Sequence, residues 1–321
     1  MISWIQEMMS NKIKKDKKIK QSIIRKLNIL FFILIVVILI LKEINKNIIN
    51  NSKISIIIPT YNRAKIISKA IKSCLEQTYN SIEIIIIDDC SKDNTKEVLK
   101  YLKVWGKESN QGRMNLSKKI IKKINDMRIK YIKLLKHKGA SYSRNIGIKK
   151  AKGRYISFLD SDDVFLPEKL KIQINNLIKH NSDLDFCKVN RIAGVHKRIF
   201  PNEIQVNIIK NGNIYDELLT NGNFISTQTI LVKKEYIEKY LFDEEMPRLQ
   251  DYELLIRMLP SIKVSFTNKI LVISYLQRDS ISIYRPKILK AVRLLLKKKY
   301  SLNIEQKRNF SKFLNNILRK K

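Results

Sequence analysis

Three carboxylates, Asp160, Asp162 and Asp163, stand within four positions directly after the apolar run 155–159. The run is typical of a buried β-strand, so we expect the carboxylates at the carboxyl end of a sheet strand. Side chains alternate between the faces of an extended segment, which lets Asp160 and Asp162 point to one side. Carboxylates that close repel each other unless a cation lies between them, and Mg²⁺ or Mn²⁺ in such sites usually also binds substrate phosphates. The spacing indicates a metal and nucleotide-diphosphate site; an acidic turn that caps the next helix is the alternative.

The segments around this triplet alternate between strand and helix. Periodicity and end signals predict strands at 54–58, 82–87, 128–134, 155–159, 185–191 and 226–232, and helices at 64–78, 95–102, 138–151, 166–181, 234–240 and 251–259. Residues 264–275 are expected as strands around a turn at Asn268, and 103–127 as a surface excursion. This order predicts an α/β domain at 53–282 with a Rossmann-like, mostly parallel sheet flanked by helices.

Composition restricts the classes of partner. The chain has 321 residues, with 64 Lys and Arg against 29 Asp and Glu, a net charge of +35. Such a charge suits nucleic acid, acidic membranes or phosphate-rich ligands. The Lys residues are spread along the whole chain and no nucleic-acid motif is present, so we expect no nucleic-acid partner. A general bias toward Lys, Ile and Asn is the other explanation of the charge.

The cysteines and histidines give no metal or disulfide pattern. They are Cys74, Cys90, Cys187, His137, His180 and His196, and none has a partner at metal-ligand spacing. We expect the cysteines to be buried thiols and the histidines to be surface or structural residues.

The N-terminal part carries a candidate membrane anchor. A basic segment at 1–26 precedes the apolar run 27–41, and a polar linker follows at 42–52. At about 1.5 Å of rise per residue the run spans roughly 22 Å, short of a hydrocarbon core of roughly 30 Å. Flanking lysines that reach the interface would close the gap. We expect a single-pass or monotopic membrane protein, with the side of the catalytic domain left open; a buried core helix is the alternative.

The C-terminal tail, 283–321, is basic and amphipathic. Apolar residues fall on one helical face, with lysine and arginine beside them. Such a helix suits an acidic membrane surface, or it packs on the domain and leaves its basic face in water. The sequence leaves both open.

Five motifs, taken in order, resemble one known family. They are Ile-Pro-Thr-Tyr-Asn-Arg at 58–63, Asp-Asp-Cys-Ser-Lys-Asp-Asn-Thr at 88–95, Gly-Ala-Ser-Tyr-Ser-Arg-Asn-Ile-Gly at 139–147, Leu-Asp-Ser-Asp-Asp at 159–163 and Gln-Asp-Tyr-Glu-Leu-Leu-Ile-Arg at 250–257. Together they resemble the family 2 glycosyltransferases over roughly 53–282. The resemblance implies a GT-A fold, a nucleotide-sugar donor, a divalent metal and inversion at the anomeric carbon.

The resemblance also implies roles for individual residues. It places Pro59, Thr60, Tyr61, Arg63, Asp89, Arg144, Asn145, Asp160 and Ser161 on the nucleotide sugar, and Asp160 and Asp162 on the metal. Asp89 would accept a hydrogen bond from the base. Uracil has an imide N–H that can donate to a carboxylate, so the resemblance favours a uracil nucleotide. Asp162 would be the direct metal ligand, with Asp160 nearer the ribose.

Asp251 matches the family's catalytic base, which takes the proton of the acceptor hydroxyl. The family usually has Glu-Asp here, whereas this chain has Gln250 before Asp251. The expected function is a metal-dependent, inverting glycosyltransferase that acts in polysaccharide biosynthesis. It would move a sugar from a nucleotide-diphospho-sugar, which we expect to be UDP-linked, to a hydroxyl of a glycan, lipid or protein. A degenerate binding or scaffold protein is one alternative; a nucleotidyltransferase is another, although no Gly-rich loop follows the first strand.

Overall fold

The computed structural model describes residues 7–9, 21, 25–26, 28–40, 43, 52–102, 127–210, 212, 214–276 and 285–319. The chain divides into two compact units, Met1–Asn51 and Ser52–Lys321. The excursion expected at 103–127 lies almost wholly outside the described residues.

In the first unit, residues 28–40 are helical and their apolar side chains are exposed. Within the described part of the chain, no helix has the length and apolar character needed to cross a membrane. The anchor helix expected at 27–41 is therefore not found as a membrane span. Attachment to a membrane stays a prediction.

The first half of the second unit forms the parallel part of a sheet. Strand β1 (Ile54–Thr60) pairs in parallel with β2 (Ile82–Asp88) and β4 (Tyr155–Phe158), and β2 pairs in parallel with β3 (Ile129–Lys133). The register sets Thr60 beside Asp88. Because parallel strands end at the same edge, the segments that carry the first four sequence motifs all leave the sheet from this edge.

The second half makes the sheet mixed rather than mostly parallel, which corrects the predicted topology. The strand order is β3-β2-β1-β4-β8-β6-β9-β5, with β7 paired to β6. Strand β8 (Ile230–Lys233) runs antiparallel to β4 and to β6 (Leu184–Ala193). Strand β7 (His196–Phe200) follows β6 after only Gly194 and Val195, and so short a turn must reverse the chain.

Residues 264–275, expected as two strands around a turn, form the single strand β9 (Val264–Tyr275). It pairs in parallel with β6, and its far end pairs with the short antiparallel β5 (Val164–Phe165). Thr267 lies opposite Cys187 and Ile270 opposite Lys188, so the intervening residues bulge out. A bulge absorbs extra residues while the chain keeps its direction, which explains why polar Asn268 does not end the strand.

The helices lie where strand ends meet apolar periodicity. They are α2 (Ile67–Leu75), α3 (Thr95–Leu102), α4 (Ala140–Lys150), α5 (Lys169–His180), α6 (Glu203–Lys210), α7 (Ile214–Asn221), α8 (Lys234–Tyr240), α9 (Gln250–Met258), α10 (Arg285–Lys297) and α11 (Ile304–Arg319), with 3-10 turns at Thr227–Thr229 and Leu259–Ser261. Of these, α6 and α7 have no counterpart in the helices predicted from the sequence.

Both faces of the sheet are covered at its centre, which explains why β1 and β2 are largely apolar and buried. Helices α4, α8 and α9 pack on one face, where Ile57, Ile85 and Ile87 join the main core cluster. Helices α2 and α5 lie toward β5 and β9. Helix α4 approaches β1 so closely that a Cβ at Gly147 would lie 2.4 Å from Cγ2 of Ile57. This contact fixes the start of α4 above the strand ends.

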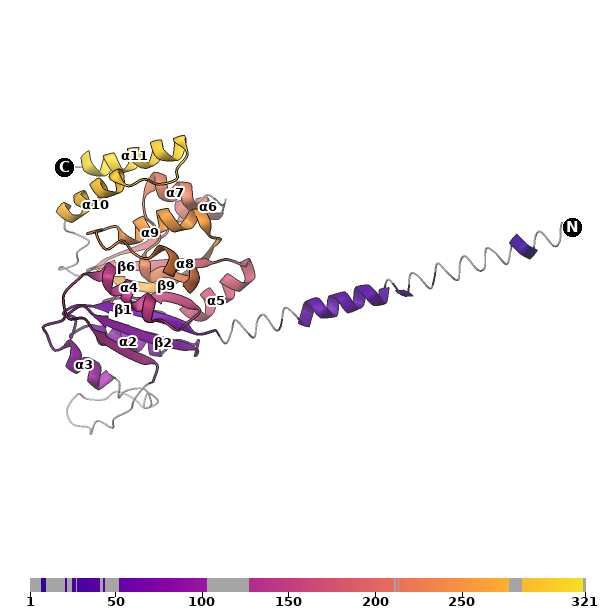
Figure 1. Cartoon of the computed structure of the whole chain (residues 1–321), viewed down its shortest axis with the longest axis horizontal. Helices are drawn as coiled ribbons and strands as arrows, with labels where there is room; N and C mark the ends of the chain where they lie inside the picture. Colours follow the sequence, from indigo (N-terminus) through magenta and orange to yellow (C-terminus); the bar gives the residue numbers. More distant parts are fainter. Residues whose placement is uncertain are drawn as a thin grey trace. The chain divides into compact units, whose positions relative to one another are not determined.

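The C-terminal helices are part of the folded unit. On α10, Ala291, Val292 and Leu295 are fully buried, and α11 packs against α7 and α10 through a face that includes Phe310 and Leu314 (Figure 1). Of the two roles left open for this tail, the structure shows the packed one. The apolar face of the tail packs against the rest of the domain.

Candidate functional site

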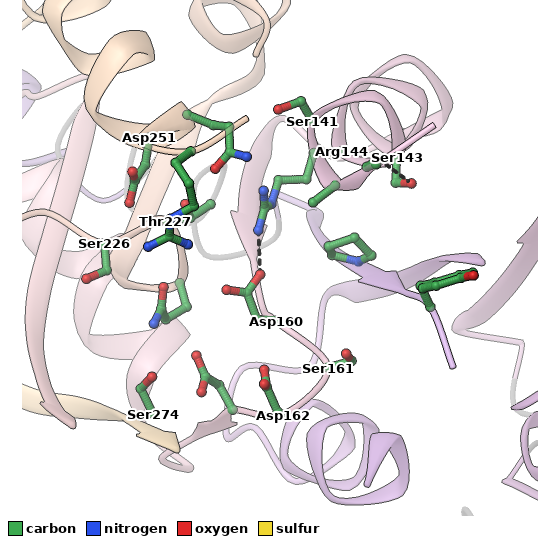
Figure 2. Close-up of a pocket in the computed structure, with 18 of the residues that line it drawn as sticks. Ser141, Ser143, Arg144, Asp160, Ser161, Asp162, Ser226, Thr227, Asp251 and Ser274 are labelled. Carbon is green, nitrogen blue, oxygen red and sulfur yellow. Dashed lines mark hydrogen bonds and ion pairs between the residues drawn. The ribbon is translucent and has the colours of Figure 1, made fainter. Parts of the chain in front are cut away.

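A cavity of about 860 Å³ opens at the edge of the sheet where β1, β2 and β4 end. Its other walls are the start of α4, the β6–β7 hairpin and the segment that leads into α9. Ten of the predicted site residues line it: Pro59, Thr60, Tyr61, Arg63, Asp89, Arg144, Asp160, Ser161, Asp162 and Asp251. The fold therefore brings four separate motif loops and Asp251 to one cavity (Figure 2).

Four polar side-chain atoms in the cavity walls are buried without a hydrogen-bond partner. They are Oγ1 of Thr60, Oγ of Ser141 and the Nε atoms of Arg144 and Arg248, and only two other such atoms occur among the described residues. A buried polar atom without a partner costs about 1–3 kcal/mol. Their concentration here indicates that a polar ligand completes these walls.

The acidic triplet forms one side of the cavity. Arg144, on α4, donates through Nη2 to Oδ1 of Asp160 at 2.6 Å, and Figure 2 shows this contact beside Asp162. Asp163 is buried, and its carboxylate accepts the backbone N–H of Tyr275. Burial and the charges of Asp160 and Asp162 raise the pKa of Asp163 well above its usual value. The triplet is thus a concentration of negative charge that a cation would relieve.

The alternative reading of the triplet, as a helix cap, is wrong for the helix that follows. Helix α5 begins at Lys169, its N-cap position is Glu168, and no side chain caps it. Asp160, Ser161 and Asp162 instead face the cavity.

The loops after β1 and β2 hold each other in place. The side chain of Asp88 accepts the backbone N–H of Ser91 and the hydroxyl of Tyr131, at 2.8 and 2.6 Å. The backbone N–H of Asn62 donates to Ser91, and Oδ1 of Asn62 accepts the N–H of Lys92. Asn62 has a left-handed backbone with φ of 52°, which asparagine tolerates better than most residues.

Asp89 fixes the loop that leads into α4. Its carboxylate accepts the backbone N–H groups of Lys138 and Gly139, both at 2.7 Å, and Nδ1 of His137 lies 2.8 Å from Oδ2. The ring of His137 lies against the ring of Tyr61, with centroids 4.2 Å apart. His137, expected as a surface or structural residue, therefore lines the cavity. His137 lies directly after the third predicted strand, at the edge of the sheet where ligands bind. This position in the sequence could have indicated that it lines the cavity.

Asn145 is the one predicted donor-binding residue that does not line the cavity. It is buried, and its amide donates to the backbone carbonyl of Phe242 and to Oε1 of Glu244, while it accepts the N–H of Phe242. Its amide is saturated by this segment, which corrects the predicted contact with ribose or diphosphate. Asn145 instead ties α4 to the chain that leads toward α9.

Asp251 stands in the first turn of α9, on the wall opposite Arg144 (Figure 2). The residue before the helix, Leu249, has a left-handed backbone with φ of 58°, which costs about 1–3 kcal/mol for such a side chain. This turn lets Arg248, Gln250 and Asp251 all line the cavity. Burial lowers the pKa of Arg248, with Asp251 and Asp160 opposing the shift and Arg191 adding to it.

Behind Asp251, α9 carries a fully buried carboxylate, Glu253. Arg257, one turn further on, contacts it through Nε and Nη2, and Nζ of Lys298 lies 2.8 Å from Oε1. Lys298 also pairs with Asp243. Because a buried carboxylate needs such partners, α9 is tied to the chain that follows α10.

The β6–β7 hairpin supplies cationic residues that the sequence motifs did not reveal. Arg191, His196 and Arg198 line the cavity, as does Lys287 at the start of α10. The alternation of His196, Arg198 and Phe200 was the available signal, since one face of a strand presents every second residue.

The described side chains offer only part of a metal site. Among the described residues, no three His, Cys, Asp or Glu side chains are arranged to hold a metal ion by themselves. Asp160 and Asp162 offer two carboxylates, and Mg²⁺ is often bound by one or two carboxylates together with substrate phosphates. The residues fit a metal that the donor helps to hold.

Comparison with known proteins agrees with this arrangement. The family model described as Glycosyl transferase family 2 matches residues 55–241. The E. coli protein named UDP-Glc:alpha-D-GlcNAc-diphosphoundecaprenol beta-1,3-glucosyltransferase WfgD is 31% identical over 219 residues, 67% of this chain and 73% of its own length. An uncharacterized glycosyltransferase of Rickettsia conorii is 33% identical over 213 residues, 64% of this chain. This match spans only 30% of the Rickettsia conorii protein's length.

Solved structures show the same fold. TarS of S. aureus in complex with UDP-GlcNAc aligns with a TM-score of 0.58 and 21% identity, over 82% of this chain and 72% of that one. The mannosyltransferase PcManGT from Pyrobaculum calidifontis, in complex with GDP-Man and Mn²⁺, gives a TM-score of 0.56 and 13% identity, over 82% and 68%.

Proposed function

The chain belongs to glycosyltransferase family 2, and from this membership we propose that it transfers a sugar from a UDP-linked donor to a hydroxyl group of a glycan or lipid-linked acceptor, with inversion and with a divalent metal. The observation that carries the proposal is one cavity that holds the acidic triplet on one side and Asp251 on the other. A binding protein would need the donor loops, but it would have no use for a carboxylate across from them.

The donor's nucleotide belongs at the ends of β1 and β2. Tyr61 offers an aromatic face there, and Asp89 offers a carboxylate. Both are occupied by His137, so a base that stacks on Tyr61 and donates to Asp89 has to move the imidazole. The names of two similar proteins, WfgD and TarS with its bound UDP-GlcNAc, support uridine, while PcManGT was crystallised with GDP-Man.

The donor's diphosphate belongs beside Asp160 and Asp162, which would hold Mn²⁺ or Mg²⁺. When bound, such a metal stabilises negative charge on the departing diphosphate. Arg144 keeps Asp160 in place by a contact of 2.6 Å, and this contact turns the carboxylate toward the cavity. Asp163, behind them, holds the end of β9 through Tyr275.

Asp251 would act as the general base. The acceptor oxygen attacks the anomeric carbon and gives its proton to the carboxylate of Asp251, while the bond from that carbon to the diphosphate oxygen breaks. Arg248 lies close enough to Asp251 that the charge of the carboxylate opposes the lowering of the arginine's pKa, so the two side chains stand on the same part of the cavity wall. Attack from the Asp251 wall, opposite the donor loops, is the geometry that inverts the anomeric carbon.

Turnover of the donor tests this proposal most directly. The full chain is incubated with UDP-glucose, UDP-GlcNAc or GDP-mannose and Mn²⁺, and release of nucleoside diphosphate is followed. We expect slow release with a UDP-sugar and faster release once a suitable acceptor hydroxyl is added. Tight binding of the donors with no release under any condition would favour a binding protein instead.

A further inference from the structure

Two arginines face each other across the β6–β7 hairpin. In the antiparallel register Arg191 lies directly opposite Arg198, and both line the cavity. Cross-strand neighbours have Cβ atoms about 4.5–5.5 Å apart, and like charges in this position destabilise the pair. The arrangement therefore carries a cost that some other property of the hairpin must offset.

No carboxylate offsets it among the described residues. Arg191 donates to the hydroxyl of Ser226 and lies over the ring of Phe200, 4.9 Å from its centroid, and neither partner is an anion. No ion pair of the described residues involves Arg191 or Arg198. The side-chain carboxylates that line the cavity are Asp89, the acidic triplet, Glu244 and Asp251, and none of them is on the hairpin.

Further cations converge on the same wall. Arg248 is close enough that the charge of Arg191 contributes to lowering its pKa, and its Nε is buried without a partner. Lys287 also lines the cavity, from the first turn of α10. The strand alternation is informative as well: His196, Arg198 and Phe200 face the cavity, whereas Lys197, on the same strand, does not line it.

We propose that Arg191, Arg198 and Arg248 bind a diphosphate group carried by the acceptor. The planar fork of a guanidinium matches phosphate oxygens with two parallel hydrogen bonds, and an anion between Arg191 and Arg198 removes their repulsion. The inference rests on the proposed function, because it assigns this wall to the acceptor. Of the carboxylates, Asp251 acts most strongly on Arg248 and Asp160 less, so the arginines lie near the group that would face the acceptor hydroxyl, while the donor's diphosphate would lie at the acidic triplet with its metal.

The test measures binding of a probe to the full chain. UDP and excess Mn²⁺ are present throughout, so that the donor side of the cavity is occupied. The probe is a diphosphate diester, with a methyl ester on one phosphate and an octyl ester on the other. Its binding is measured by calorimetric titration. Octyl glucoside serves as the neutral analogue, and inorganic phosphate separates a carrier-linked group from the free ion. We expect the diester to bind at least tenfold more tightly than either.

Arg198→Gln should weaken binding of the diester by about tenfold to a hundredfold, the usual loss for a charge-assisted contact. Lys197→Gln, with the same charge change on the same strand, should alter it less than twofold. Both side chains are exposed, so neither change disturbs the core. Affinity for UDP with Mn²⁺ should stay unchanged in both variants.

Two results would overturn the inference alone: equal effects of Arg198→Gln and Lys197→Gln on the diester, or equal binding of the diester and octyl glucoside. Loss of UDP affinity in Arg198→Gln would assign the arginines to the donor and overturn it too. If the parent protein bound neither UDP nor any UDP-sugar, the proposed function would fail, and this inference with it.

Discussion

In the loops after β1 and β2, polar groups form hydrogen bonds with one another, whereas the hairpin wall presents its charges to the cavity. On the donor side, Asp88 and Asp89 are saturated by backbone N–H groups and side chains, and Arg144 is paired with Asp160. On the hairpin side, Arg191 and Arg198 have no anionic partner among the described residues. The donor loops are held by contacts within the protein, although Thr60, Ser141 and Arg144 keep unpartnered polar atoms there, whereas the described part of the chain offers the hairpin arginines no anion.

The difference teaches where specificity resides. A preorganised wall suits a ligand of constant structure, because the cost of ordering it is met during folding. A wall of unpaired cations is stabilised only by the right anion, so it discriminates among acceptors. The donor site should therefore tolerate little change, whereas the hairpin should set which acceptor is used.

The largest expected effect lies at Asp251, across the cavity from the donor loops. Asp251→Asn should lower transfer by about 10²–10⁴-fold, because the amide cannot take the proton. Folding should be unaffected, since Leu249 is the N-cap residue and the carboxylate of Asp251 accepts only the adjacent N–H of Tyr252. Steady-state rates and UDP affinity are measured on parent and variant. Near-parental transfer would leave Asp251 as a first-turn charge of α9.

A second, smaller effect sharpens the account of the donor wall. Removal of divalent metal with chelator should weaken UDP binding and slow transfer, and Asp162→Ala should reproduce the loss and no longer respond to added Mn²⁺. The reason is that the diphosphate and the carboxylates of Asp160 and Asp162 repel one another without a cation. Calorimetry of UDP binding with and without Mn²⁺ measures this. Activity that persists in excess chelator would remove the metal from the mechanism.

The smallest effect concerns the support beneath the donor wall. Lys169 is fully buried, and its Nζ contacts Ser157 on β4 and Gln173 on α5. Burial lowers the pKa of Lys169 from 10.5 to about 8. Between these values the folded chain binds fewer protons than the unfolded chain, so stability should rise with pH, by about 3 kcal/mol over the whole interval. Below pH 8 the cost of burying the charge is fully present.

This effect is read as a difference between proteins. The free energy of unfolding of the parent should rise from pH 8 to pH 10 relative to that of Lys169→Met, whose buried side chain does not titrate. Lys171→Met, at an exposed position on the same helix, should follow the parent. Parallel curves for all three proteins would show that Lys169 keeps an ordinary pKa.

The same contrast explains how much the sequence revealed. The donor loops follow directly on apolar strands, and Thr60, Asp89 and Asp160, which the family resemblance assigned to the nucleotide sugar, all line the cavity at these strand ends. Arg191 and Arg198 are seven residues apart and meet only because Gly194 and Val195 reverse the chain. Pairing register of this kind depends on tertiary contacts, which a single strand's pattern does not contain.

Other differences have similar causes. Asn145 belongs to a polar motif that the sequence pattern places near the start of a helix, where exposure is expected. In the fold it is buried, and its amide donates to the backbone carbonyl of Phe242. The apolar stripe of α10 fits a membrane or a protein core equally well, and only its packing against α11 and into the main core cluster decides between them. Proline-free, apolar 264–275 continues as one strand because β6 offers a partner along its whole length.

The pairing of Glu253 with Lys298 has a consequence for synthesis of the protein. Domains fold as the chain leaves the ribosome, from the N-terminus onward. The donor loops are complete once α5 has emerged, but Glu253 gains its second cation only when residue 298 is free of the exit tunnel. Until then, of the two cations that contact Glu253 in the folded protein, only Arg257 is available. The wall that carries Asp251 is incomplete at that stage. Because Ser52–Lys321 is one compact unit, the wall that carries Asp251, the proposed base, is finished only when nearly all of that unit has been made.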